Sequence, residues 1–169
     1  MRYGSGILLS CLIIAFSWGC DDDDLPEPTQ EGADMLAAKI DGDNWEADAL
    51  PTDIKAVEGS YTTSSNTLII TGRRVDQNNN QILEIALREI QGEGDYTIDL
   101  KAPSEAYYED RKEETRYNTT TQHGGDLELT YFNTELGIAA GTFSFQALNE
   151  DNEEIEITEG RFDINIRVN

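Results

Sequence analysis

The strongest constraint on the fold is a two-residue alternation of apolar and polar side chains. Successive side chains of a strand point to opposite faces, so such a segment has one apolar face and one mostly polar face. This pattern is typical of antiparallel strands that bury one face only. The alternation runs through residues 83–88, 127–132, 142–146 and 162–168, and shorter segments rich in β-branched or aromatic residues cover 68–71 and 96–100.

Polar turn sequences separate these segments. The residues Asp41-Gly42-Asp43-Asn44, the run 78–80 of three Asn and the run 149–152 each indicate a hairpin loop. Signals for amphipathic helices are weak, so residues 36–169 are predicted to form one all-β domain. We expect an antiparallel β-sandwich, with an open β-barrel as the alternative. Trp45, directly after the first turn, is expected to fill the core.

Residues 103–125 are predicted to be a long irregular excursion, because they are rich in charge and contain a Thr run and Gly124-Gly125. Tyr107, Tyr108 and Tyr117 fall in this stretch. Exposed aromatic rings on loops can hold sugars or peptides, which makes the three tyrosines candidate ligand-binding residues. The alternative is that they close one end of the core with their hydroxyls in water.

The N-terminal residues 1–19 read as a cleavable signal peptide. Arg2 is followed by an apolar run over residues 7–16, which is too short for a permanent membrane span. The run ends in Ser17-Trp18-Gly19-Cys20, which resembles the lipobox of bacterial lipoproteins and implies lipidation of Cys20. An ordinary secretory signal with an incidental Cys is the alternative. Cys20 would be the only cysteine of the mature chain, so it could form no intrachain disulfide.

Residues 20–35 are predicted to be a lipidated, disordered acidic linker. Asp21, Asp22, Asp23 and Asp24 form a solvated charge block, and the Pro- and Gly-containing stretch that follows has no apolar period. The block resembles the acidic export signal of surface-exposed lipoproteins in Bacteroidota, which implies the outer face of the outer membrane. Retention in the inner membrane and a merely hydrophilic spacer are the alternatives.

The charge balance excludes nucleic acid as a partner. The chain has 12 Lys and Arg against 34 Asp and Glu, a formal net charge of −22 at pH 7. Phosphate backbones require clustered cations, and an acidic surface repels them.

Residues that could carry catalysis or bind a metal give weak signals. His123 is the only histidine and no Gly-x-Ser-x-Gly elbow accompanies it, so we expect an exposed loop side chain and no catalytic residue. One histidine with a single mature cysteine is too few for a zinc site. Two acidic clusters could supply oxygen ligands to calcium, but polar hairpin turns that happen to be acidic explain them better, and no metal or cofactor is predicted. These clusters are Asp41, Asp43 and Asp48, and Glu150, Asp151, Glu153 and Glu154.

Both ends of the domain resemble a family of small Bacteroidota lipoproteins built on a β-rich domain of unknown function. The resemblance rests on Lys39-Ile40-Asp41-Gly42 with Trp45, and on the closing hairpin over residues 141–145 and 155–164. It implies a location and a fold but no reaction. We therefore expect an outer-membrane, surface-exposed lipoprotein with a non-catalytic binding or accessory β-domain, attached through its lipid and recognising a glycan or a protein. The alternatives are an enzyme acting on surface glycans or peptides and a calcium-stabilised structural module.

Overall fold

The computed structural model describes residues 25–49 and 54–169. In these ranges the chain forms twelve β-strands and no helix, so the predicted all-β class is confirmed. None of the described residues belongs to a helix that could span a membrane. The strands are β1 Met35–Ile40, β2 Asp43–Glu46, β3 Asp48–Ala49, β4 Val57–Thr62, β5 Thr67–Val75, β6 Asn80–Leu87, β7 Gly94–Ile98, β8 Glu105–Asp110, β9 Thr115–Asn118, β10 Gly125–Asn133, β11 Ile138–Leu148 and β12 Glu154–Val168.

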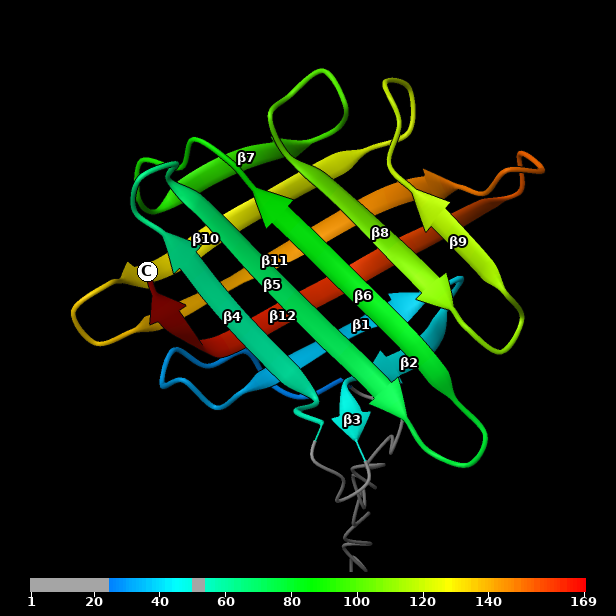
Figure 1. The fold of residues 1–169 in the computed structure, drawn as a ribbon, viewed down its shortest axis with the longest axis horizontal. Helices are drawn as coiled ribbons and strands as arrows, with labels where there is room; N and C mark the ends of the chain where they lie inside the picture. The colour runs from blue at the N-terminus through cyan, green and yellow to red at the C-terminus, as the bar shows by residue number, and fades with distance from the viewer. Residues whose placement is uncertain (1–24, 50–53) are drawn as a thin grey trace, which may run out of the picture.

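The strands form two layers that cross each other (Figure 1). The front layer has the order β4-β5-β6-β8-β9, and the back layer has the order β7-β10-β11-β12-β1-β2. Two contacts join the layers, one between β12 and β4 and one between β9 and β11, so all twelve strands belong to one hydrogen-bonded sheet. The arrangement is sandwich-like and is not a regular barrel.

Two of the pairings are parallel, where the sequence predicted an antiparallel fold throughout. Residues 166–168 of β12 run parallel to residues 59–61 of β4, and the short β3 runs parallel to the end of β5. Apolar alternation reports which side chains face inward and does not report the direction of the neighbouring strand. The sheet is therefore mixed, although the other pairings are antiparallel.

The core lies between the layers and is built by the predicted alternation. In β11, Phe143, Phe145 and Ala147 are buried while the residues between them are exposed. The Phe143 ring lies 6.5 Å from the ring of Phe162 on β12. Full burial of each such side chain stabilises the fold by about 1.5–3 kcal/mol. Trp45 is also buried, as expected. Its indole N–H needs a partner in the core and donates a hydrogen bond to Gln81 Oε1 at 3.0 Å.

The three predicted hairpin turns are present between β1 and β2, β5 and β6, and β11 and β12. In the first, Asp41 and Gly42 have φ of 51° and 89°, which is the backbone of a two-residue type I′ turn. The Asp41 carboxylate accepts a hydrogen bond from the backbone N–H of Glu156 at 2.8 Å. One acid of the first calcium candidate thus holds the turn against β12.

The predicted irregular excursion over residues 103–125 is wrong. It contains β8 and β9, which pair as an antiparallel hairpin, and β8 also pairs with β6. The inward side chains of β8 are Ala106 and Tyr108, whereas Tyr107 points the opposite way. The apolar alternation of β8 is hard to recognise in the sequence, because the small Ala106 faces inward and the aromatic Tyr107 faces outward. The charged turn at 111–114 also gave the stretch the composition of a loop.

The start of the folded domain also needs correction. Residues 25–34, which we call the strap, were predicted to be flexible tether but lie against β12. Leu25 is buried, and the Arg161 guanidinium donates to the Pro26 carbonyl at 3.0 Å. The Asp163 carboxylate accepts hydrogen bonds from the strap at Thr29 Oγ1 and at three backbone N–H groups. These contacts are long-range in sequence, so local composition did not reveal them.

Candidate functional site

One end of the sandwich is hollowed. The hollow is lined by residues at the end where the C-terminus lies and has a volume of about 520 Å³. That end of the sandwich is on the left of Figure 1. We call the hollow the end hollow. Its apolar lining side chains are Tyr61, Ile90, Phe132 and Val168, and its polar ones are Thr63, Asn66, Gln91 and Thr134. Gly92 completes the lining. These residues come from the β4–β5 turn, from residues 88–93, from the end of β10 with its following turn, and from the end of β12.

Backbone hydrogen bonds tie these segments together around the hollow. Thr63 N–H donates to the Asn169 carbonyl at 3.1 Å, and Asn169 N–H donates to the Tyr61 carbonyl at 2.8 Å. On the other side, Ile90 N–H donates to the Asn66 carbonyl at 3.0 Å. The loop segments are therefore held by the strands rather than left free, which is how a rigid scaffold positions a binding site.

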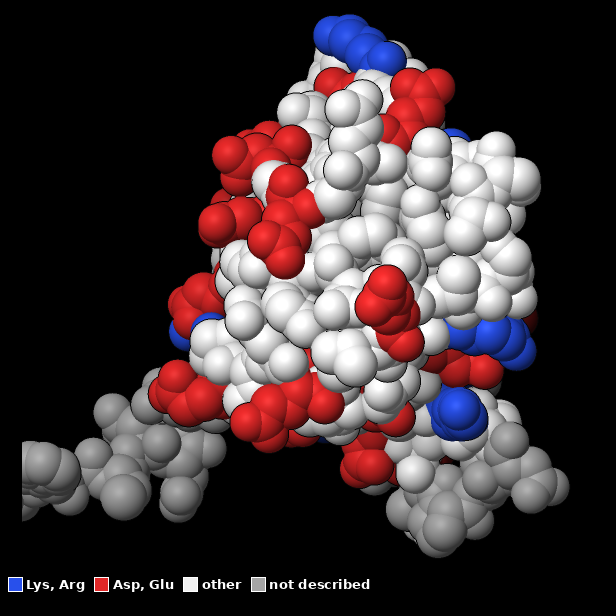
Figure 2. All heavy atoms as spheres, turned by 90° about the vertical axis from the view of Figure 1, so that its left-hand side faces the viewer, with Lys and Arg blue, Asp and Glu red and all other residues white. Residues whose placement is uncertain are grey.

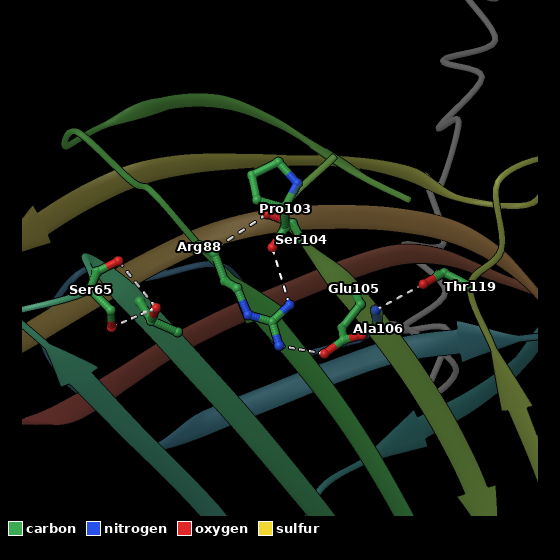
Figure 3. Close-up of polar contacts among 8 residues, drawn as sticks. Ser65, Arg88, Pro103, Ser104, Glu105, Ala106 and Thr119 are labelled. Atoms are coloured by element: carbon green, nitrogen blue, oxygen red, sulfur yellow. Dashed lines mark hydrogen bonds and ion pairs between the residues drawn. The ribbon is translucent and has the colours of Figure 1, made fainter. Parts of the chain in front are cut away.

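Side-chain contacts fix the two segments of the front layer that reach the hollow (Figure 3). The Arg88 guanidinium donates to the Pro103 carbonyl at 3.2 Å and to Glu105 Oε1 at 2.6 Å, so residues 88–93 start from a point fixed against β8. In the β4–β5 turn, Ser65 Oγ donates to Thr67 Oγ1 at 2.9 Å. Neither Arg88 nor Ser65 belongs to the lining of the hollow.

Two aromatic rings meet in the hollow. The Tyr61 and Phe132 ring centroids are 5.0 Å apart, and the rings stand edge to face at 80°. This is a favoured geometry for aromatic pairs. The Tyr61 hydroxyl donates to Asn66 Oδ1 at 2.8 Å, and Phe132 N–H donates to Glu93 Oε1 at 3.2 Å. The pair thus joins the two layers at this end.

The lining contains no charged side chain, although 27% of the chain is charged. Figure 2 views this end directly and shows a mostly uncharged surface, with Asp and Glu gathered around its margins and one acidic side chain near its middle. Leu136 and Val168 are exposed at this end to 65% and 40%. An uncharged surface with exposed apolar side chains on a strongly acidic protein is a candidate interaction site.

Two polar side chains of the hollow have unused hydrogen-bonding groups. Among the described residues, the side chains of Gln91 and Thr134 have no hydrogen-bond partner. Both residues are exposed, so water satisfies them in the free protein. The end hollow can therefore offer aromatic and aliphatic surface together with amide and hydroxyl groups to a ligand.

Comparison with known families covers most of the chain. Residues 33–164 match the family described as a domain of unknown function, DUF6252. The chain belongs to the DUF6252 family. Neither the curated proteins nor the solved structures gave a significant match. The match begins at the end of the strap and stops just before the last residues of β12, so the DUF6252 domain comprises nearly the whole two-layer fold.

The three tyrosines predicted as ligand-binding residues do not form one exposed surface on the DUF6252 domain. Tyr108 lies in the core, and burial raises the pKa of its hydroxyl well above the usual range. Tyr107 lies on the outer face of β8 beneath Arg116, whose guanidinium carbon is 3.5 Å from the ring centroid. Burial and the nearby Glu84 carboxylate raise the Tyr107 pKa. Tyr117 is half-buried beside Tyr108, with ring centroids 6.4 Å apart.

The remaining residues that the sequence singled out form no site in the structure or lie outside the residues that it describes. His123 lies in the loop before β10, where its Nδ1 is 3.3 Å from Thr120 Oγ1 and its Nε2 is 3.5 Å from Glu154 Oε2. The histidine is only partly exposed, where the sequence predicted an exposed side chain. No group of three or more potential metal ligands converges in the part of the chain that the structure describes. Cys20 and Asp21, Asp22, Asp23 and Asp24 lie outside the described residues.

The sequence did not indicate Tyr61 and Phe132 as site residues. Alternation placed Leu127, Leu129 and Tyr131 on one face of β10 and Phe132 on the other. However, the register between β10 and β11 shifts between Leu129 and Tyr131, and Phe132 packs against the core instead. Such a bulge reverses the facing of every residue beyond it. The only sequence signal was the polar Thr134 to Gly137 turn that follows two adjacent aromatic residues.

Proposed function

We propose that this chain is a surface-exposed lipoprotein of the outer membrane whose DUF6252 domain binds a ligand without catalysing a reaction. The signal-like residues 1–19, the lipobox-like Ser17 to Cys20 and the block of four Asp support the membrane attachment. The acyl chains of such an anchor each contribute roughly 10 kcal/mol of burial at about 0.8 kcal/mol per methylene. Net negative charge keeps the domain soluble and away from anionic headgroups.

The end hollow carries the binding part of this proposal. It combines loops held by a strand scaffold, a paired aromatic surface and an uncharged lining on an otherwise acidic protein. Its volume of about 520 Å³ lies in the range of about 300–1,000 Å³ that is usual for ligand sites. Binding at this end would leave the strap and the anchor free to hold the domain at the membrane.

Fractionation of cells tests the attachment. Cys20→Ala should move the protein from the membrane fraction to the soluble fraction, because the acceptor of the lipid is gone. Cys11→Ala is the matched control, since Cys11 lies in the segment that is removed and its loss should leave the protein in the membrane. Persistent membrane association of the Cys20 variant would refute lipidation as the cause.

Protease treatment of intact cells tests surface exposure. Replacing Asp21, Asp22, Asp23 and Asp24 with Ala should lower cleavage by an external protease, while replacing all four with Glu should preserve it because the charge is kept. The folded domain is the same in both variants. Equal cleavage of wild type and the Ala variant would defeat the export-signal hypothesis.

A further inference from the structure

We propose that the ligand of the end hollow is a neutral carbohydrate. This inference rests on the proposed function and names the class of molecule that the site recognises. Three properties of the hollow favour such a ligand: the absence of charge in its lining, the presence of apolar side chains beside amide and hydroxyl groups, and the hydrogen bonds of the surrounding backbone.

The charge of the lining selects against ionic ligands. An anionic ligand would meet no cation in the hollow and would be repelled by a chain of net charge −22. A cationic ligand would need a carboxylate inside the hollow, and buried charges require such a partner. Glu93, which follows the lining residue Gly92, already accepts a hydrogen bond from the Phe132 N–H. A neutral ligand has neither requirement.

The mixture of groups fits a sugar ring. A sugar presents an apolar C–H face and a rim of hydroxyls, so it needs flat apolar surface next to side chains that both donate and accept hydrogen bonds. Phe132 and Val168 supply the apolar surface, and the Gln91 amide and Thr134 hydroxyl supply the polar groups. An amide both donates and accepts, which suits hydroxyls of either orientation. The half-polar, open hollow is a poor match for a lipid chain, which needs an enclosed apolar cavity.

The backbone around the hollow argues against an extended peptide. A peptide that adds to a sheet edge needs unpaired N–H and C=O groups along a strand. Here Tyr61, Thr63 and Asn169 already exchange hydrogen bonds, and Ile90 is paired with Asn66. These backbone groups are therefore not free to pair with a peptide strand, and the side chains of the lining are left to recognise a sugar.

The test is an array that carries three classes of probe: neutral oligosaccharides, oligosaccharides with uronic acid or sulfate groups, and 15-residue peptides. The full chain, purified in detergent, is applied as wild type and as three variants. Gln91→Ala removes an exposed amide that makes no hydrogen bond to the other described residues. Phe132→Ala removes the aromatic surface. Tyr107→Ala, on the outer face of β8 and away from the hollow, is the matched aromatic control.

The wild type should bind neutral oligosaccharides, and Gln91→Ala should weaken that binding about fivefold through loss of hydrogen bonds. Phe132→Ala should weaken it by about tenfold or more, and Tyr107→Ala should leave it unchanged. Because Phe132 also packs against the core, thermal unfolding is measured for each variant, and the exposed Gln91 variant carries the test if the Phe132 variant fails to fold.

The outcomes separate the two proposals. Binding to peptides or to charged oligosaccharides that Gln91→Ala weakens would overturn the carbohydrate inference and leave a binding function at the end hollow. Binding that no hollow variant weakens, or no binding to any of the three classes, would overturn both the inference and the site. Membrane attachment is judged separately by the behaviour of the Cys20 variant.

Discussion

Replacing Asp163 with Asn should release the strap from the domain. The Asp163 side chain is fully buried, and its two oxygens accept four hydrogen bonds from the strap. Thr29 Oγ1 donates at 2.5 Å, and the N–H groups of Glu31, Gly32 and Ala33 donate at 2.9, 2.7 and 3.2 Å. An amide has one oxygen, so it loses at least one of these bonds and aims an N–H at another donor.

The size of the effect follows from those bonds. A hydrogen bond to a charged acceptor contributes about 1.5–3 kcal/mol, and leaving a buried group unpaired costs a similar amount. We therefore expect a loss of about 2–3 kcal/mol in strap docking. If the strap and domain unfold together, the melting temperature falls by about 4–12 °C for a chain of this size.

Hydrogen exchange at residues 29–33, together with thermal unfolding, measures this effect. The variant should exchange much faster at Glu31, Gly32 and Ala33 than wild type. Asp126→Asn is the control, because that exposed acid undergoes the same change in charge and its carboxylate makes no hydrogen bond to the described residues. Unchanged exchange at the strap, with a melting temperature within about 1 °C of wild type, would refute the reasoning.

The hydrogen bonds between Asp163 and the strap also predict that docking of the strap depends on pH. Burial alone raises the Asp163 pKa, but the hydrogen bonds from Thr29 and from the three backbone N–H groups outweigh it and lower the pKa below its usual 3.8. A carboxyl group with a lowered folded-state pKa stabilises the fold above its unfolded pKa and loses that contribution as the pH falls through the folded value. Strap protection should therefore be constant from neutral pH down to about pH 5 and should fall only below about pH 4.

Three further predictions concern the domain itself. Gly141→Ala should destabilise it by about 1–3 kcal/mol, measured by denaturant unfolding, because the added methyl would overlap the Glu128 carbonyl and the Phe162 ring. Gly42→Ala should destabilise it by only about 1 kcal/mol, since that Cβ would meet open space and only its φ of 89° is unfavourable; a larger loss than for Gly141→Ala would contradict both. Millimolar Ca²⁺ should shift the melting temperature by less than about 1 °C, because the Asp41 carboxylate already accepts a backbone N–H; a large rise would support a calcium-stabilised module.

Much of the fold could be predicted from the sequence because its strands bury one face each. The alternation in β11 corresponds directly to the observed burial, and Phe162, Ile164 and Ile166 of β12 are buried as it predicts, although Asp163 is buried beneath the strap and Val168 is exposed. The Asp41-Gly42 turn has the backbone that its residues favour. These are local properties, set by side-chain period and by turn chemistry. They are visible without knowledge of which strands are neighbours.

The features that could not be predicted depend on contacts between residues that are far apart in the sequence. The strap has the composition of a linker, and side chains of β12 more than 130 positions later, Asp163 and Arg161 among them, hold it in place. Tyr107 and Tyr108 read as loop residues because Ala106 interrupts the apolar face of β8. The end hollow joins Tyr61 to Phe132 across two layers, and a register shift in β10 turns Phe132 inward. No local pattern contains that information.

The claim that this protein is an anchored surface lipoprotein is tested most directly by its intact mass after purification from membranes in detergent. The mature chain should begin at Cys20 and be heavier than the sequence of residues 20–169 by the mass of a diacylglyceryl group and one further acyl group. A free thiol at Cys20, or a chain that retains residues 1–19, would contradict this claim.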